Sequence, residues 1–364
     1  MRVLFLLLEP ELSGRTRAFA SAARALAARG HPVTVAYPSD APGDAVLEHP
    51  SYEVQPIRAG GPWISLVLRL RELLAERFIE VVFVHTEREQ FVAAAAARLA
   101  GRAAVVRRVS SGELPDAGRE EWIASQLAAT GWLFATDDDR RAADSQVDGA
   151  FPASAAPLGV AVEEYGHLDA VARAAIGPAA HEKLIICVHD DSGRVRAAVA
   201  LRTMALLAPL HRTLGLVFVG HGTYDQELRM HAAALGINRH VAFLGPRAEP
   251  RGVLRAADLG WVTASGDDAA YAFLDLAALG IPVIAPRTPL AQRYVSDGIT
   301  GLLIGENPHA TAAAVARLLA DPRAREAMGR AAQMHVARLW TANAMVDGFE
   351  RTVQTAGDRT RWAG

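Results

Sequence analysis

The sequence predicts an α/β protein with two doubly wound domains, each holding a parallel β-sheet covered by helices on both faces. Short apolar, β-branched runs alternate with helix-period segments along the chain, and this alternation pauses once, between residues 163 and 183. Continuous apolar runs are typical of strands that are buried on both faces, as in parallel sheets. A length of 364 residues fits about two domains of ordinary size.

The N-terminal half begins with an apolar run, Val3–Leu8, that predicts a buried strand. Its six apolar residues, followed by Glu9, are too few for a signal peptide or a membrane span. The helix-period segment Thr16–Arg29 then ends at Gly30, a residue type that closes many helices. Further strands are predicted at Val33–Ala36, Val81–Val84, Ala104–Val106, Trp132–Ala135 and Ala156–Leu158, with an alanine-rich helix at Gln90–Leu99.

A second series of strands and helices follows the pause. We expect an N-terminal domain of residues 1–168, a C-terminal domain of residues 169–340, and a final helix in 341–364 that is a candidate to pack back on the first domain. The predicted strands are Leu184–Val188, Leu216–Val219, Val241–Leu244, Leu259–Thr263, Pro282–Ala285 and Gly301–Ile304. The predicted helices are Ala197–Leu207, Tyr224–Leu235, Pro250–Ala257, Ala270–Leu279, Pro289–Asp297, and those from Pro308 to Leu339 and from Ala342 to Thr355.

The charged residues nearly balance, with 38 cations against 40 acids, which removes the general electrostatic argument for nucleic-acid binding. Lys183 is the only lysine, so arginines or backbone amides must hold any anion. Cys187 is the only cysteine, which excludes an intramolecular disulfide and a cysteine-based metal site. Because Cys187 lies within the apolar run Leu184–Val188, we expect a buried small hydrophobe rather than a catalytic thiol.

The stretch Ser265–Ala285 is the most informative part of the chain. A small-residue loop leads into a helix predicted to start near Ala270, and such a helix start offers amides and a partial positive charge to a diphosphate. Asp267 precedes the helix and Asp275 lies eight residues later. One carboxylate could then meet a ligand at the helix start while the other reaches vicinal hydroxyls. The alternative is a pair of solvated acids beside an ordinary strand-to-helix turn.

This stretch resembles the signature of family 4 retaining glycosyltransferases of the GT-B fold, in which two glutamates eight positions apart precede Gly-x-Pro-Val-Ile. Asp267 and Asp275 keep the spacing, and Gly280–Ile284 matches the second part. The resemblance extends over nearly the whole chain. It includes Val219–Gly222, Val241–Gly245, Asp297–Leu303, Leu158–Val160, Gly14 and the segment Arg24–Val33.

The resemblance implies two Rossmann-like domains facing a cleft, with a C-terminal domain for the nucleotide-sugar donor and an N-terminal domain for the acceptor. Asp275 would then hold the ribose and Asp267 the sugar. Arg194 or Arg196 would stabilise the leaving diphosphate, together with the amides of Ala269, Ala270, Tyr271 and Ala272. Gly222, Leu244 and Arg247 would complete the donor side and Gly14 the acceptor side. The reaction would need no obligatory metal and no other cofactor.

The chain departs from the family pattern at several of these positions. Both signature glutamates are aspartates, and Asp190 stands where the family has an arginine. The histidine common after the strand at Ala104–Val106 is missing, and Arg108 or Ser110 could occupy its place. His85 is the alternative polar group on the acceptor side, and His189 and His221 follow strands of the donor side. Each of these histidines also has an ordinary structural interpretation.

These observations favour a glycosyltransferase that moves a hexose-like sugar from a UDP- or GDP-activated donor to an acceptor hydroxyl, with retention. The alternatives are a GT-B-like binding or scaffold protein without activity, supported by the departures, and another GT-B enzyme such as a nucleotide-sugar epimerase. We expect a cytoplasmic protein. The basic amphipathic segment Trp63–Phe78 could add peripheral contact with the inner membrane face, or could be a core-packed helix.

Overall fold

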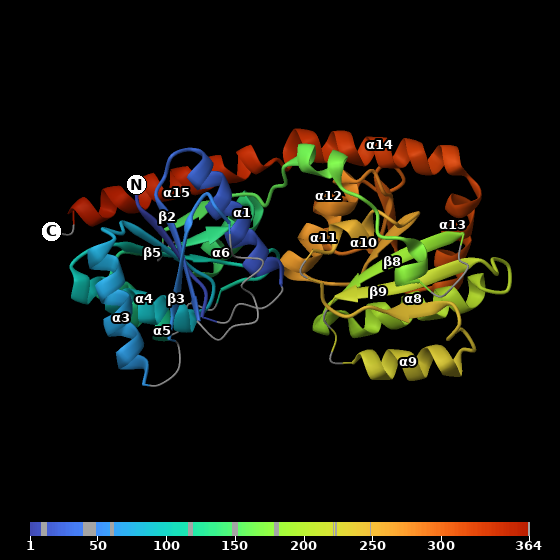
Figure 1. Ribbon diagram of the computed structural model, residues 1–364, viewed down its shortest axis with the longest axis horizontal. Helices are drawn as coiled ribbons and strands as arrows, with labels where there is room; N and C mark the ends of the chain where they lie inside the picture. The colour runs from blue at the N-terminus through green and yellow to red at the C-terminus, as the bar shows by residue number, and fades with distance from the viewer. Residues whose placement is uncertain are drawn as a thin grey trace. The chain divides into compact units, whose positions relative to one another are not determined.

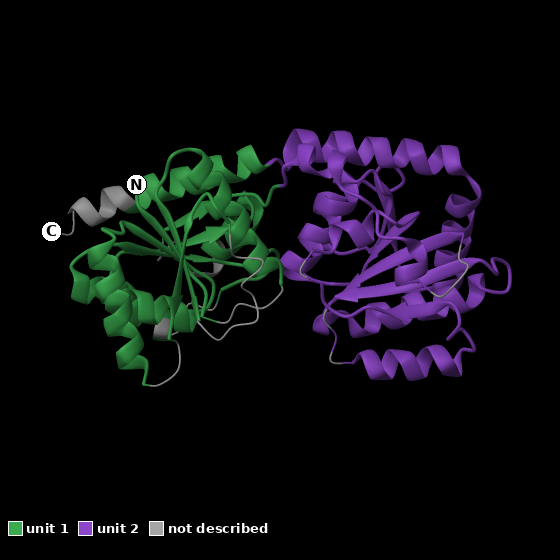
Figure 2. Cartoon of the chain, in the orientation of Figure 1, with its two compact units in different colours: residues 1–159, 342–364 green, residues 160–341 purple. Residues whose placement is uncertain are grey.

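The computed structural model describes residues 1–8, 13–38, 49–58, 62–115, 119–147, 152–177, 182–220, 222, 224–247 and 249–362 (Figure 1). The chain divides into two compact units, coloured separately in Figure 2. Unit 1 combines Met1–Gly159 with Ala342–Gly364, and unit 2 is Val160–Thr341. Each unit has its own parallel sheet and its own core, which confirms the predicted fold of two doubly wound α/β domains.

Unit 1 contains a seven-stranded sheet in the order β3-β2-β1-β4-β5-β6-β7, with every neighbouring pair parallel. The strands are β1 Val3–Leu6, β2 Val33–Pro38, β3 Glu53–Ile57, β4 Val81–Val84, β5 Ala104–Arg108, β6 Thr130–Phe134 and β7 Ala153–Ala155. The described helices are α1 Gly14–Ala28, α3 Trp63–Glu76, α4 Glu87–Ala100, α5 Arg119–Leu127, α6 Asp137–Val147 and α15 Ala342–Trp362.

Successive residues of β1 point to opposite faces of this sheet and enter two different cores. Val3 and Phe5 pack in the core that includes residues of α1 and α15, whereas Leu4 and Leu6 pack in the core beneath α3 and α4. All four residues are fully buried. Burial on both faces explains why the sequence of this strand is continuously apolar instead of alternating.

Two strands of unit 1 differ from the sequence predictions. The sequence analysis missed β3, an edge strand that is largely half-buried or exposed and contains Pro56, because its polar composition carries little strand signal. The predicted strand Ala156–Leu158 is wrong by three residues, since β7 pairs with β6 through Ala153–Ala155. Ala156 and Leu158 are buried, but they lie beyond the strand.

Unit 2 contains a six-stranded parallel sheet in the order β10-β9-β8-β11-β12-β13. Its strands are β8 Lys183–His189, β9 Leu214–Gly220, β10 Val241–Phe243, β11 Leu259–Val262, β12 Val283–Pro286 and β13 Gly301–Ile304. Its α-helices are α7 Arg173–Ile176, α8 Arg194–Leu207, α9 Asp225–Ala234, α10 Arg251–Leu254, α11 Gly266–Ala278, α12 Pro289–Tyr294, α13 Pro308–Ala320 and α14 Pro322–Leu339, with short 3₁₀ helices at Val162–His167 and Asp191–Gly193.

The chain enters unit 2 at Val160, nine residues before the start of the C-terminal domain expected from the sequence. The reason is Tyr165, which is buried and whose hydroxyl donates to Asp275 at 2.5 Å. Arg255 also donates to the Tyr165 carbonyl oxygen at 3.1 Å. These contacts hold the segment that follows Val160 to unit 2.

The final helix, α15, completes the core of unit 1. Met345, Phe349 and Val353 are buried there, and the Phe349 ring lies 5.1 Å from that of Phe83. Gly348 allows the close approach, because a Cβ at this position would lie 2.5 Å from the Cα atom of Ala156. Helix α15 therefore depends on a glycine at its contact with the end of β7.

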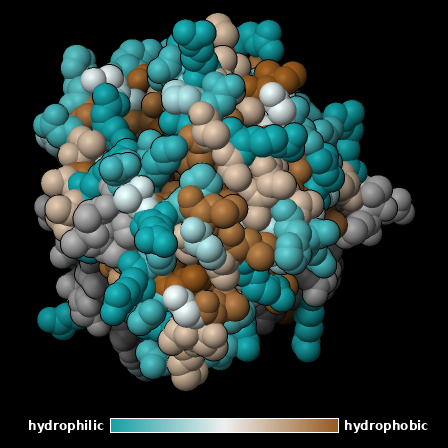
Figure 3. All heavy atoms as spheres, turned by 90° about the vertical axis from the view of Figure 1, so that its right-hand side faces the viewer, coloured by the Kyte–Doolittle hydropathy of each residue, from teal (hydrophilic) through white to brown (hydrophobic). Residues whose placement is uncertain are grey.

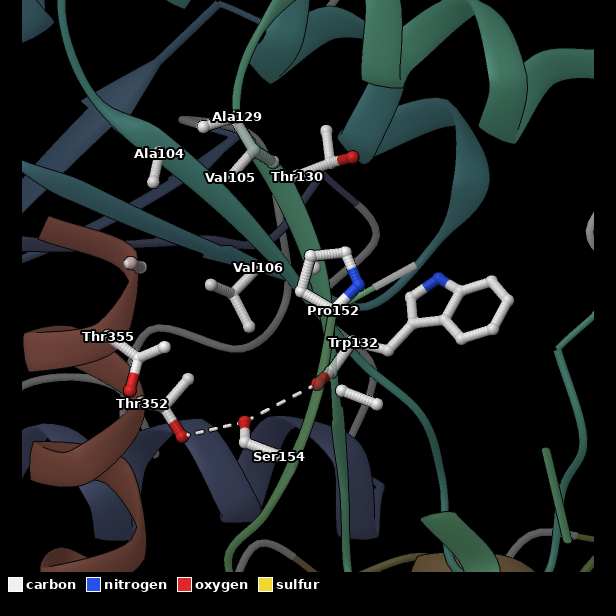
Figure 4. A pocket seen from close by; sticks show the side chains of 13 residues that line it. Ala104, Val105, Val106, Ala129, Thr130, Trp132, Pro152, Ser154, Thr352 and Thr355 are labelled. Carbon is white, nitrogen blue, oxygen red and sulfur yellow. Dashed lines mark hydrogen bonds between the residues drawn. The ribbon is translucent and has the colours of Figure 1, made fainter. Parts of the chain in front are cut away.

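A small cavity of about 100 Å³ lies beside this contact, between α15 and strands β5 to β7 (Figure 4). Its lining is mostly apolar, and the Ser154 hydroxyl is hydrogen-bonded to the Thr352 hydroxyl at 2.9 Å (Figure 4). Ala104, Thr130 and Ala153, which begin their strands, belong to its lining. Ligands of open parallel sheets bind at the opposite, carboxyl ends of the strands, so this cavity is not the candidate site.

Helix α3 is packed on the sheet through one face and exposed on the other. Leu66, Leu70 and Leu74 are buried in the core, as the core-packed interpretation requires, while Trp63 and Ile64 are exposed at its start. None of the described helices is both long and apolar enough to cross a membrane. Peripheral membrane contact stays a prediction.

On the face of the molecule drawn in Figure 3, hydrophobic side chains gather in small groups among hydrophilic ones.

Replacing Gly348 by alanine is expected to destabilise the protein by about 1–3 kcal/mol, because the new methyl group would overlap the Ala156 backbone. Urea unfolding measures the effect. Gly305→Ala is the matched control, since no described atom lies within 4 Å of a Cβ built there and its φ is not in the left-handed region. Equal stability of the two variants would contradict the close packing of α15.

The Cys187 thiol is expected to be inert in the native protein. It is fully buried, and burial raises its pKa to about 12, so almost none is present as the reactive thiolate near neutral pH. A chromogenic thiol reagent should react with one equivalent per chain only after unfolding. Rapid labelling of the folded protein would show that strand β8 is accessible and would contradict this packing.

Candidate functional site

The strand order of each sheet reverses at one place, which sets the position of the candidate sites. The reversal lies between β1 and β4 in unit 1, and between β8 and β11 in unit 2. At such a point the connections leave in opposite directions, and a crevice forms beyond the carboxyl ends of the two strands. The residues that follow these strands are therefore the candidates for ligand binding.

In unit 2 a carboxylate spans this crevice. Asp190 follows β8, and its Oδ2 accepts hydrogen bonds from the Ser265 amide at 2.7 Å and the Ser265 hydroxyl at 2.9 Å. Its Oδ1 accepts a third bond from the Ser192 hydroxyl at 2.7 Å. Ser265 is the N-cap residue of α11. The acid found where the family has an arginine thus joins the end of β8 to the start of the helix that carries the signature aspartates.

Helix α11 begins at Gly266, so the predicted start near Ala270 is wrong by four residues. The reason is that Ser265 takes an extended backbone conformation and its carbonyl oxygen accepts the first helical hydrogen bond, from the Ala269 amide at 3.1 Å. Ala269, Ala270, Tyr271 and Ala272 therefore lie inside the helix. Their amides could meet a diphosphate only if the first turn opened.

Both signature aspartates are buried in the structure. Asp267 lies in the first turn of α11 and is 3% exposed, and Asp275 lies in its third turn and is 1% exposed. The alternative of two solvated acids is therefore wrong. Oδ1 of Asp275, the residue expected to hold the ribose, accepts the hydrogen bond from Tyr165. Tyr165 was not among the predicted site residues, because no motif in the sequence links it to Asp275.

The two candidate arginines have different positions. Arg194 starts α8 and is paired with Glu227 at 2.6 Å, with both side chains largely exposed. Arg196 lies at the crevice, where its Nε donates to the Thr263 carbonyl oxygen at 2.7 Å. Its Nη2 donates to the Ser192 hydroxyl at 3.3 Å. The structure therefore favours Arg196 over Arg194 as the cation near the start of α11.

The remaining donor-side candidates lie around the ends of β8 to β10. Gly222 packs against the buried ring of His189, since a Cβ on Gly222 would lie 2.7 Å from the Cε1 atom of His189. Leu244 continues β10 and its amide donates to the Phe218 carbonyl oxygen at 2.9 Å, while Arg247 is exposed. His221 lies outside the described residues.

In unit 1 the structure brings three of the predicted acceptor-side positions together. Gly14 opens α1, and the next residue, Arg15, donates from Nε to the Ser110 hydroxyl at 2.9 Å. His85 follows β4, and its Nε2 donates to the Arg15 carbonyl oxygen at 3.0 Å. The His85 ring also stacks on Phe19 with 3.7 Å between ring centroids. Arg108, the other candidate for the missing histidine, is buried.

The sequence analysis missed Glu89, which joins the ends of β1 and β4. Its Oε1 accepts from the Leu8 amide at 2.6 Å, and its Oε2 accepts from the amides of His85 at 2.8 Å and Thr86 at 2.9 Å. Burial raises the pKa of the Glu89 carboxyl, opposed by these hydrogen bonds. Thr86 and Glu89 also form a capping box, a pattern that is visible in the sequence and could have identified the residue.

The described residues contain no group of three or more His, Cys, Asp and Glu side chains arranged to hold a metal ion.

Both parts of the chain match families of known proteins. Residues 170–335 match the family described as "Glycosyl transferases group 1", and residues 13–121 match "Glycosyltransferase Family 4". A D-inositol 3-phosphate glycosyltransferase of Corynebacterium jeikeium is 37% identical over 157 residues, which is 40% of this chain and 38% of the relative. A GDP-mannose-dependent alpha-(1-6)-phosphatidylinositol monomannoside mannosyltransferase of Mycolicibacterium smegmatis is 31% identical over 156 residues, 40% of this chain and 41% of the relative.

Solved structures share the fold over almost the whole chain. Anabaena HepE in complex with UDP and glucose superposes with a TM-score of 0.80 at 18% identity, covering 97% of this chain and 99% of that one. Sucrose-phosphate synthase from Thermosynechococcus elongatus gives a TM-score of 0.77 at 18% identity, with 98% of both chains covered.

The curated relatives are thus matched over about two fifths of their length, whereas the fold is matched throughout. The two family matches lie on the two parallel-sheet units, and the signature spacing lies on α11 of the second. Both units therefore match glycosyltransferase families, and the chain as a whole has the GT-B fold of the solved glycosyltransferase structures.

Proposed function

We propose that the protein transfers a hexose-like sugar from a UDP- or GDP-activated donor to an acceptor hydroxyl, with retention at the anomeric carbon. The observation that carries this proposal is the pair Asp267 and Asp275 on α11, whose first turn lies at the strand-order reversal of unit 2. The names of the relatives and the UDP in the HepE complex support a nucleotide-sugar donor. The predicted acceptor-side residues that lie together in unit 1, Gly14, His85 and Ser110, would bind the substrate that carries the hydroxyl.

In this proposal the donor binds to unit 2 with its ribose at Asp275 and its sugar at Asp267. An aspartate side chain is one methylene shorter than glutamate, so the ribose must approach α11 closely. The Tyr165 hydroxyl already donates to Asp275, so a ribose hydroxyl would either displace it or use the second carboxylate oxygen. Burial of both acids makes such hydrogen bonds strong, because water does not compete for them.

The leaving diphosphate would be stabilised by Arg196 and by amides at the start of α11. Charge develops on the diphosphate as the bond to the sugar breaks, and donors held in place by the fold stabilise that charge without reorganising. Arg196 is held in this way, since its Nε and Nη2 are bonded to Thr263 and Ser192. The proposal uses no metal ion and no cofactor.

The binding of ribonucleotides is expected to depend on Asp275. Calorimetry should show that UDP or GDP binds roughly tenfold more tightly than the corresponding 2′-deoxynucleotide, because a buried carboxylate that holds the ribose hydroxyls penalises their loss. In Asp275→Asn the two affinities should converge. Their convergence reports a lost ribose contact, which a purely structural role of Asp275 would not produce.

Asp268→Asn is the control for this measurement, since it removes a neighbouring acid of the same helix that has no assigned role. It should keep the preference for the ribonucleotide. The donor assignment fails if the wild-type protein binds neither UDP nor GDP at millimolar concentration. If binding occurs without any preference for the ribose hydroxyl, Asp275 loses its role.

The two arginines should differ in their effect on diphosphate binding. Arg196→Ala is expected to weaken UDP or GDP binding about tenfold or more, because it removes the cation at the crevice. Arg194→Ala should change the affinity little, since the Arg194 side chain is exposed and paired with Glu227. The affinities of both variants for UDP and for uridine separate diphosphate recognition from nucleoside recognition. Equal losses in the two variants would contradict this assignment.

A catalytically inactive binding protein is the second candidate, and Asp190 is the observation that favours it. The acid occupies the position where a cation would stabilise the leaving group. Chromatography coupled to mass spectrometry, applied to the protein incubated with UDP- and GDP-sugars, decides between the candidates, because the chromatography separates epimers of equal mass. Release of the nucleoside diphosphate supports a transferase, binding without consumption of the donor supports the second candidate, and an isomerised sugar would indicate an epimerase.

A further inference from the structure

We propose that the Asp190 carboxylate acts as an internal anion that occupies the diphosphate position at the start of α11, so that a bound nucleoside diphosphate displaces it. This inference rests on the proposed function for the class of ligand, and it adds a residue that sets the affinity for that ligand. Asp190 would oppose donor binding, where the corresponding position of the family assists it.

The contacts of Asp190 are those that a phosphate oxygen would make. The carboxylate accepts one backbone N–H and two hydroxyl hydrogen bonds, all from residues at the crevice. The amide and one of the hydroxyls belong to Ser265, the N-cap residue of a 13-residue helix, where the helix dipole favours negative charge. The Ser265 hydroxyl makes no capping bond to its own helix, and it donates to Asp190.

The space next to this contact is open. Gly266 follows Ser265 with a φ of +53°, and no described atom lies within 4 Å of a Cβ built on it. A side chain at this position would be strained and would fill that space, so the glycine keeps the start of the helix accessible. An external anion can therefore approach Ser265 and Gly266 from the side that Asp190 does not occupy.

Among the described residues, no arginine or lysine at the crevice forms an ion pair with Asp190. Arg196 is directed to the Thr263 carbonyl and the Ser192 hydroxyl, and Arg194 is paired with Glu227. Lys183 lies at the other end of β8, where it donates to the Leu319 carbonyl oxygen at 2.8 Å. A diphosphate that entered beside Asp190 would meet its negative charge, so the two anions compete for the same donors.

Binding of the diphosphate would thus exchange one hydrogen-bond acceptor for another at the start of α11. When the diphosphate arrives, the Ser265 amide and hydroxyl change partner, and the turn between β8 and α8 loses the link to α11 that Asp190 makes, whereas the contact between the Ser192 and Ser265 hydroxyls can remain. The Asp190 carbonyl oxygen keeps the turn in place during this exchange, because it accepts hydrogen bonds from the Tyr224 hydroxyl and from the Gly193 amide. Only the side chain of Asp190 has to move.

The test compares the wild-type protein with Asp190→Asn by calorimetry with UDP, GDP and inorganic pyrophosphate. Asparagine retains an oxygen that accepts from Ser265 but carries no charge, so the variant should bind the nucleoside diphosphates about tenfold more tightly. Asp191→Asn is the matched control, since it removes the same charge one residue further along without changing the bonds to Ser265. Its affinity should stay within about twofold of the wild type.

Thermal unfolding checks that Asp190→Asn is folded, and Asp190→Ser provides a second uncharged acceptor if it is not. Unchanged or weaker binding by both variants overturns the inference while leaving the donor assignment intact. Binding that requires Mg²⁺ in the wild type and loses that requirement in Asp190→Asn also overturns it, because Asp190 would then recruit a cation. If no protein binds either nucleotide under any of these conditions, the donor assignment fails and the inference fails with it.

Discussion

The structure depends on one kind of interaction that is found in both units, a carboxyl group that bridges the point where the strand order of the parallel sheet reverses. Backbone N–H groups beyond the ends of the two central strands have no neighbouring strand to accept their hydrogen bonds there. Glu89 accepts from the amides of Leu8 and His85 in unit 1, and Asp190 accepts from the amide of Ser265 in unit 2. In both units a carboxyl group that accepts backbone hydrogen bonds thus links the segments that follow the two central strands.

The two bridging residues, Glu89 and Asp190, would affect the binding of a ligand differently. Glu89 is buried in unit 1 and accepts from the His85 amide, near the hydrogen bond between Arg15 and Ser110 to which the proposed function assigns the acceptor side. Asp190 is only half-buried and lies where a nucleoside diphosphate would bind. Under the proposed function, a bridging carboxyl group would therefore stabilise the acceptor side and oppose the ligand on the donor side.

The single lysine of the chain limits which side chains can supply positive charge to the crevice of unit 2. Lys183 binds a carbonyl oxygen near the C-terminal end of α13, a favourable place for a cation, and so takes no part in the site. Arginine must supply the positive charge of the donor crevice, and Arg196 does so with a side chain whose planar fork is already bonded to Thr263 and Ser192. An arginine held in this way can donate hydrogen bonds to a diphosphate, but its side chain cannot move with the ligand as a flexible lysine side chain can.

The sequence by itself determined the class of fold, most of the strands in both units and the resemblance to the family, because buried parallel strands are continuously apolar and the signature on α11 is a local pattern. It could not determine that Ser265 rather than Ala269 precedes α11, that Tyr165 donates to Asp275, or that Arg196 rather than Arg194 lies at the crevice. The last two depend on partners far apart in the chain, 110 residues in the case of Tyr165 and Asp275. Asp190 illustrates the difference: the sequence identified an acid at an unexpected position, and only the tertiary structure placed its charge at the start of a helix.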